Sequence, residues 1–203
     1  MGQRLNIEIK SKGKILANSY YHWSAYSERS LELMKKIIDN FHEIQDDNEV
    51  IRAVKLLGLT GAGLTREAIH YAYKNIDNFD LTVDDGKGLF SRYLIPMATD
   101  RNNGLINISD KEMQDTRYWE EGRITINTDN KTFDFNVLFK MPLMTFIKEY
   151  EDVKIENLKE PPFNFENIPF NKIEKLMEFV KTTQQKSDGA FKLNNDEIGI
   201  LIY

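Results

Sequence analysis

Arg4-Leu5-Asn6-Ile7-Glu8-Ile9 alternates polar and apolar side chains, which is the period-two pattern of a strand with one buried face. Ser11-Lys12-Gly13-Lys14 follows as a turn, and residues 15–23 form a second run of strand length. This stretch predicts an N-terminal β-hairpin, and the rest of the fold is expected to build outward from it.

The second strand ends in an aromatic cluster, Tyr20-Tyr21-His22-Trp23-Ser24-Ala25-Tyr26, just before an expected helix. Side chains alternate across a strand, so Tyr20 and His22 share one face while Tyr21 and Trp23 share the other. One face should be core and the other accessible. The rings either fill the seam between hairpin and helix, or they form a recognition surface that stacks on a base or ring. The sequence leaves both interpretations open.

A second hairpin is predicted in residues 123–137, where two runs of clear period-two alternation flank the turn Thr128-Asp129-Asn130-Lys131. A further strand is expected over residues 105–108. Hairpins are mixed with helices without a regular βαβ rhythm. The predicted class is therefore α+β, with an antiparallel or mixed sheet built from hairpins and helices packed on one face.

Helices are predicted where apolar residues recur at three- and four-residue steps, the first of them in the segment after Ser27. Asp46-Asp47-Asn48 and Thr65 are expected to cap the next two helices, because their side-chain oxygens accept from free backbone N–H groups. Ser109 and Glu112 have the spacing of a capping box.

Consecutive prolines in Glu160-Pro161-Pro162-Phe163 indicate a linker, because proline stiffens the chain and breaks strand pairing. We therefore expect a main domain over residues 1–158 and an extension over residues 159–203, packed on the main domain. The extension should contain a helix over residues 171–185 and a closing hairpin. A homodimer is predicted if Ile198 to Tyr203 pairs between chains as an edge strand.

Composition excludes several classes of function. The chain has 203 residues, a formal net charge of −5, three His and no Cys. An acidic chain argues against general nucleic-acid binding, which needs a basic face. The absence of Cys removes thiolate sites, and the three His lack metal-ligand spacing, so no metal and no cofactor is expected. No apolar run approaches a membrane span and no signal peptide is evident, which predicts a soluble cytoplasmic protein.

Three further patterns have weak functional interpretations. The turn at Gly61-Ala62-Gly63-Leu64-Thr65 would bind an anion at a helix start, but a plain interhelical turn explains it better. The tight turn Asp100-Arg101-Asn102-Asn103-Gly104 offers polar groups to a ligand if it faces a pocket. Glu120-Glu121 is interpreted as a solvated turn and not as a metal site.

The opening Met1-Gly2-Gln3-Arg4-Leu5 and the Tyr20–Tyr26 cluster resemble the start of a family of phage and prophage proteins of Gram-positive bacteria. The later segments Thr99 to Ile106 and Tyr118 to Gly122 are similar to the same family, so the resemblance covers residues 1 to 140. It carries no activity and no residue roles. It implies an accessory phage protein, made inside the host, that acts against a host defence.

The first functional hypothesis is a phage-encoded inhibitor of a bacterial anti-phage defence system that acts by binding. It would block a host defence protein or sequester a nucleotide-derived signalling molecule. In the second case aromatic rings would stack on a base while Arg4 or Arg101 pairs with phosphate. The ligand-binding residues predicted for this role are Arg4, Tyr21, His22, Trp23, Tyr26, Asp100, Arg101 and Asn102.

Two alternatives belong to other classes. One is a nucleotide-signal hydrolase in which His22 acts with Glu8 or Asp100. The other is a structural or assembly accessory without a ligand. Binding ranks first because of the phage resemblance, the acidic cysteine-free composition and the missing catalytic motif, since the sequence contains no nucleophile elbow. The structural accessory ranks second and the hydrolase third, and no residue is assigned as catalytic.

Overall fold

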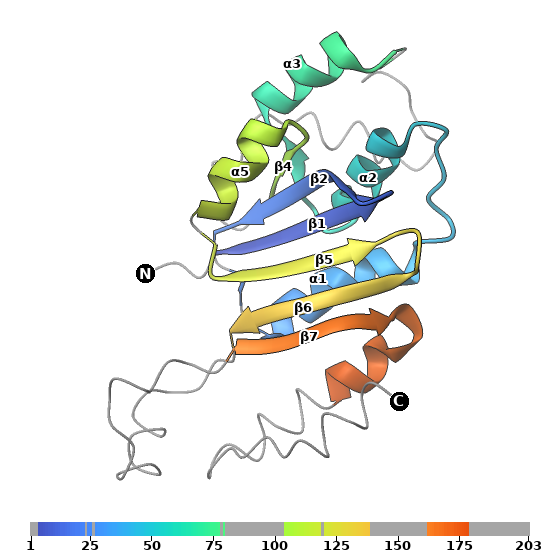
Figure 1. Cartoon of the computed structure of the whole chain (residues 1–203), viewed down its shortest axis with the longest axis vertical. Coiled ribbons are helices and arrows are strands. Elements are labelled where there is room, and N and C mark those ends of the chain that lie inside the picture. Colours follow the sequence, from blue (N-terminus) through green and yellow to red (C-terminus); the bar gives the residue numbers. More distant parts are fainter. Residues whose placement is uncertain are drawn as a thin grey trace.

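The computed structural model describes residues 4–22, 24–25, 27–77, 79, 104–118, 120–138 and 162–178. These residues form a mixed sheet of seven strands in the order β3-β4-β2-β1-β5-β6-β7 (Figure 1). The strands are β1 (Leu5–Ser11), β2 (Lys14–Tyr21), β3 (Gly63–Leu64), β4 (Leu105–Asn107), β5 (Gly122–Asn127), β6 (Thr132–Leu138) and β7 (Pro162–Pro169).

The predicted N-terminal hairpin lies at the centre of this sheet. Strand β1 pairs antiparallel with β2 and parallel with β5, so that Ile7 lies between Ser19 and Ile124. Strands β5 and β6 form the second predicted hairpin, and β7 adds to β6 in the antiparallel sense. At the other edge β3 pairs parallel with β4. The predicted α+β class with a mixed sheet is confirmed.

Helices begin where the sequence places their caps. The helices are α1 (Ser27–Asp39), α2 (Glu49–Gly58), α3 (Arg66–Asn75) and α5 (Asp110–Tyr118). The side chain of Asn48 accepts from the backbone N–H groups of Val50 and Ile51, and Thr65 accepts from that of Ala68. These contacts satisfy N–H groups that lack partners inside the helix, which confirms both caps.

The two faces of the sheet differ in chemistry. Leu5, Ile7 and Ile9 of β1 are at most 1% exposed and belong to the core that α1 and α2 cover, behind the sheet in Figure 1. Asn6 and Glu8 alternate with them and therefore face the other side. Helix α5 lies on that side, because its Arg117 contacts Glu8. The expectation of helices on one face holds for α1 and α2, while α5 covers part of the opposite face.

The expected linker at residues 160–163 is wrong for its last two residues, because Pro162 and Phe163 begin strand β7. Strand β7 is one of the two edge strands of this sheet, and proline is tolerated at the first residue of an edge strand, where no ladder bond is lost. A 3-10 helix, η2 (Phe170–Lys172), and helical residues 173–178 follow, which confirms part of the helix expected at 171–185. Residues 139–161 lie outside the described residues, so the boundary near residue 158 stays a prediction.

The turn expected at residues 61–65 is wrong in part, because Gly63 and Leu64 form β3 by pairing with Leu105 and Ile106. A two-residue strand made by a distant partner leaves no periodic signal in the sequence. The expected dimer strand at residues 198–203 lies outside the described residues. Among the helices that the structure describes, none combines the length and the apolar character that a membrane crossing requires.

Candidate functional site

The aromatic cluster divides between the two faces of the sheet as its alternation predicts. Tyr21 is 2% exposed and belongs to the core, where its hydroxyl bonds to Thr60 Oγ1. Burial raises the pKa of the Tyr21 phenol. The ligand-binding role of Tyr21 stays a prediction, and it requires the ring to leave this packed position.

Arg4 and His22 both lie next to Tyr20 at one edge of the cluster. The backbone N–H of Arg4 donates to Glu121 Oε2 at 2.9 Å, and the Tyr20 hydroxyl lies 3.5 Å from His22 Nδ1. Burial raises the pKa of Tyr20, and the neighbouring Arg4 opposes that rise. Arg4, Tyr20 and His22 are therefore half-buried neighbours beside the start of β1 and the end of β2.

The remaining predicted ligand residues lie outside the described residues. They are Trp23, Tyr26, Asp100, Arg101 and Asn102. Their roles stay predictions.

A layer of buried polar side chains lies between the sheet and α5. We call it the polar layer, and its members are Asn6, Glu8, Asn18, Asn107, Thr116, Arg117 and Thr125. Four of its five sheet residues, Asn6, Glu8, Asn18 and Asn107, are at most 4% exposed. Buried polar groups are expensive unless they are hydrogen-bonded, so such a layer must be either structural or functional.

Hydrogen bonds connect the polar layer internally. Arg117 Nε donates to Glu8 Oε1 at 2.6 Å, and Thr125 Oγ1 donates to Glu8 Oε2 at 3.4 Å. Asn18 Nδ2 donates to Asn6 Oδ1 and Thr116 Oγ1, at 3.3 and 2.8 Å. Asn107 Nδ2 donates to Asn18 Oδ1 at 3.0 Å.

This pairing bears on the hydrolase alternative, which assigns His22 a nearby carboxylate. Glu8 stands opposite Asn18 in the hairpin register, whereas the residue next to His22, Tyr21, stands opposite Leu5. The Glu8 carboxylate is held in an ion pair with Arg117 and is 2% exposed. A general base must reach a substrate proton, and the buried, paired Glu8 carboxylate is not placed to do so. We therefore interpret the polar layer as the structure that fixes α5 on the sheet.

Glu120 was expected in a solvated turn, and this is wrong. Its side chain is 16% exposed, accepts from Asn6 Nδ2 at 2.7 Å and pairs with Arg123. The chain folds Glu120 back because β5 runs parallel to β1, which places Arg123 beside Asn6. Glu121 is exposed, as expected.

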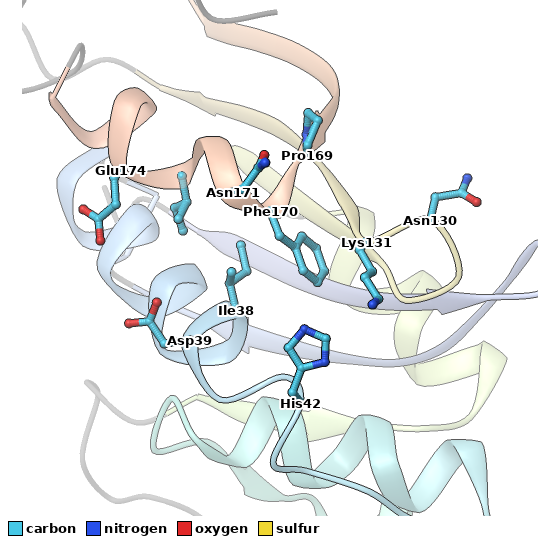
Figure 2. A pocket seen from close by; sticks show the side chains of 10 residues that line it. Ile38, Asp39, His42, Asn130, Lys131, Pro169, Phe170, Asn171 and Glu174 are labelled. Atoms are coloured by element: carbon cyan, nitrogen blue, oxygen red, sulfur yellow. The ribbon is translucent and has the colours of Figure 1, made fainter.

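A separate pocket of about 560 Å³ lies at the other side of the fold, and we call it the η2 pocket (Figure 2). The end of α1, the β5–β6 turn and the segment that follows β7 meet there. Its lining residues are Ile38, Asp39, His42, Asn130, Lys131, Pro169, Phe170, Asn171, Ile173 and Glu174. This volume falls within the range of small-molecule pockets.

The apolar floor of the η2 pocket is fixed by aromatic packing. The ring of Phe41 is 3% exposed and meets Phe170 and His42 edge-on, at centroid distances of 5.1 and 5.5 Å. The Arg52 guanidinium lies over Phe41, 4.5 Å from its centroid. The backbone N–H of Phe170 donates to the Lys131 carbonyl at 3.0 Å, which ties η2 to the β5–β6 turn. The floor is therefore preformed.

The rim of the η2 pocket separates its charges. Asp39 and Glu174 lie together on one side, and both pair with Lys35, whose ammonium is 2.9 Å from Asp39 Oδ2. Figure 2 shows Lys131 and His42 on the other side, with the Phe170 ring and Ile38 between the two groups. In the part of the chain that the structure describes, no carboxylate forms a salt bridge with Lys131.

Sequence reasoning missed the η2 pocket, because its lining comes from three segments that are unremarkable separately. One weak signal was available. That signal is the polar turn at residues 128–131, because Asn and Asp side chains stabilise turns by bonding to the backbone. In the structure the Asn127 side chain accepts from the backbone N–H groups of Asp129 and Asn130, and Lys131 has a left-handed φ of 54°.

Within the described residues no group of three or more His, Asp or Glu side chains is arranged to hold a metal ion.

No protein-family model, no curated protein and no solved structure matches the chain. The resemblance to phage proteins therefore stays a prediction.

Proposed function

We propose that this protein acts by binding a small polar molecule in the η2 pocket, and that it thereby removes the molecule from solution. This is the sequestering form of the predicted phage anti-defence role, whose setting rests on the resemblance. The observation that carries the proposal is the preformed floor of Phe170 and Ile38 beneath a rim of separated charges. Apolar floors with a few placed polar groups are typical of ligand sites.

Binding without turnover is favoured over catalysis by the state of the polar groups. Asp39 and Glu174 share the ammonium of Lys35, and Glu8 is paired with Arg117. A carboxylate already held by a cation is not free to take a proton from a substrate. These groups serve better as fixed hydrogen-bond acceptors.

The test is a thermal-shift screen of the full chain against linear and cyclic nucleotides, NAD, ADP-ribose derivatives, amino acids and sugar phosphates. A ligand at 100 times its dissociation constant should stabilise the protein by roughly 2.7 kcal/mol, which raises the melting temperature by several degrees. We expect His42→Gln to weaken the shift. His70→Gln is the matched control, because His70 is exposed on α3 beside the opposite edge of the sheet.

A second measurement separates binding from turnover. The ligand is incubated with the protein and then recovered and examined by mass spectrometry, and we expect it unchanged. Conversion of the ligand would instead support the hydrolase alternative. The absence of a shift with every compound would count against a small-molecule ligand and in favour of inhibition by contact with a defence protein.

A further inference from the structure

The charge arrangement of the η2 pocket restricts the chemistry of its ligand. One side presents the Lys131 ammonium, the His42 ring and the Asn130 side chain, and all three offer hydrogen-bond donors. Such a set suits an anionic group with several acceptor oxygens, since charge-assisted bonds are stronger than neutral ones. Lys131 has no carboxylate partner among the described residues, and it is exposed on this side of the pocket.

The opposite side presents acceptors. Asp39 and Glu174 meet across Lys35, whose pKa is raised by Glu174 and then by Asp39, so that the ammonium stays charged. A carboxylate has about four lone-pair sites, and one shared ammonium cannot occupy all of them. The remaining sites can accept from hydroxyl or amino groups of a ligand. Lys35 also offsets part of the negative charge that would otherwise repel an anion bound across the pocket.

Between the two sides lie apolar side chains. The Phe170 ring is held edge-on against Phe41, and Ile38 and Ile173 line the pocket beside it. An aromatic or heterocyclic ring packs well on such a floor. A lipid tail would meet charged groups on both sides.

A nucleoside phosphate has groups that match the donor side, the acceptor side and the apolar side chains of the pocket. We infer that the η2 pocket binds a nucleoside phosphate in a single orientation. Its phosphate lies against Lys131 and His42, its base covers Phe170, and its ribose hydroxyl or exocyclic amino groups donate to Asp39 and Glu174. This inference rests on the proposed binding function and adds the ligand class and its direction in the pocket.

The test is calorimetric titration of the full chain with AMP, adenosine, ribose 5-phosphate and inorganic phosphate. We expect AMP to bind at least tenfold more tightly than each of the other three, because each lacks the phosphate, the base or both the base and the ribose. Lys131→Gln should weaken AMP about tenfold, the effect of one charge-assisted contact, and should leave adenosine unchanged. Lys74→Gln is the matched control, since Lys74 is exposed on α3, beside the opposite edge of the sheet.

Each outcome decides one statement. AMP selectivity that depends on Lys131 supports the ligand class and the orientation. Adenosine, ribose 5-phosphate or phosphate binding as tightly as AMP, or AMP binding that Lys131→Gln leaves intact, overturns this inference while leaving a binding protein. If AMP and its fragments do not bind while another class of compound in the wider screen does, the inferred ligand class is wrong and the proposed binding function stands. If nothing in either set binds, both fail. Circular dichroism of each variant establishes that it is folded.

Discussion

The guanidinium of Arg117 on α5 lies 2.6 Å, Nε to Oε1, from the carboxylate of Glu8 at the centre of the sheet. The two partners differ in exposure, since the Glu8 side chain is 2% exposed and the Arg117 side chain 33%. The carboxylate raises the pKa of the Arg117 guanidinium, which favours the charged form of the guanidinium. Because one partner has access to water and the other has almost none, the two ends of this ion pair respond differently to mutation.

Removing Arg117 should destabilise the protein more than neutralising Glu8. Arg117→Leu leaves a buried carboxylate without its cation, at a cost of about 3–5 kcal/mol. Glu8→Gln keeps an acceptor for Arg117, which remains partly hydrated, and should cost about 1–2 kcal/mol. Urea unfolding at pH 7 measures both. Equal losses, or a larger loss for Glu8→Gln, would contradict the role given to the polar layer.

Helix α5 should open more readily than α2. Of the α5 residues only Met113 is a buried apolar side chain, whereas α2 buries Ala53, Val54, Leu56 and Leu57. Opening α5 therefore exposes mainly polar groups that water can satisfy, and local opening free energies are low where few apolar contacts are lost. Hydrogen exchange should show residues 114–118 exchanging before residues 53–58. Matched protection of the two helices would show that α5 is part of the core unit.

Tyr21→Phe should change the dependence of stability on alkaline pH. Burial raises the folded-state pKa of Tyr21 above its ordinary value near 10. The stability linked to this shift is fully present below the unfolded-state pKa and is lost as pH rises through the folded-state pKa, because the unfolded chain releases the proton first.

At pH 8 the variant should therefore be less stable by about 1 kcal/mol, for the lost bond to Thr60. Above pH 10 this deficit should shrink by up to about 1.4 kcal/mol per pH unit, the energy of one pKa unit. Urea unfolding at pH 8 and pH 11 makes the comparison. A deficit that stays constant between the two would mean that the Tyr21 phenol titrates normally in the folded protein.

Gly104→Ala should destabilise the protein more than Gly122→Ala. A methyl group at Gly104 would overlap the ring of Tyr21 and approach Ala62 Cβ to 2.9 Å, whereas at Gly122 the nearest atom, Ala25 Cβ, is 3.2 Å away. Overpacking of a core costs about 1–3 kcal/mol, which lowers the melting temperature of a chain this size by several degrees. Differential scanning calorimetry compares the two variants. Similar melting temperatures would show that the Tyr21 ring can shift to admit the methyl group.

Local signals in the sequence predict much of this fold. The alternation in β1, β5 and β6 identifies strands, and Asn48 and Thr65 are correct caps, because each of these signals acts within a few residues. The separation of Tyr20 from Tyr21 also follows from period-two alternation. Such features depend on local hydrogen bonds and on the geometry of one strand.

Features that depend on distant partners could not be predicted. Gly63 and Leu64 are a strand because Leu105 and Ile106 pair with them, and Pro162 is tolerated because β7 lies at the sheet edge. The η2 pocket escaped prediction for the same reason, since Asp39, Lys131 and Glu174 meet through the order of strands in the sheet. The first hypothesis placed the ligand at the aromatic cluster, where Tyr21 turns out to be packed in the core.

The parallel pairing of β1 with β5 also has a consequence during synthesis on the ribosome. Strands β1 and β2 can pair as soon as Tyr21 has emerged, but the second edge of β1 receives its partner only when Asn127 has been made. At 5–20 residues per second, the roughly 100 intervening residues take about 5–20 s to translate. For that interval the nascent hairpin exposes a strand edge flanked by Leu5, Ile7 and Ile9, all of which are buried in the finished protein. Nascent-chain chaperones should therefore engage this protein early and release it once β5 has docked.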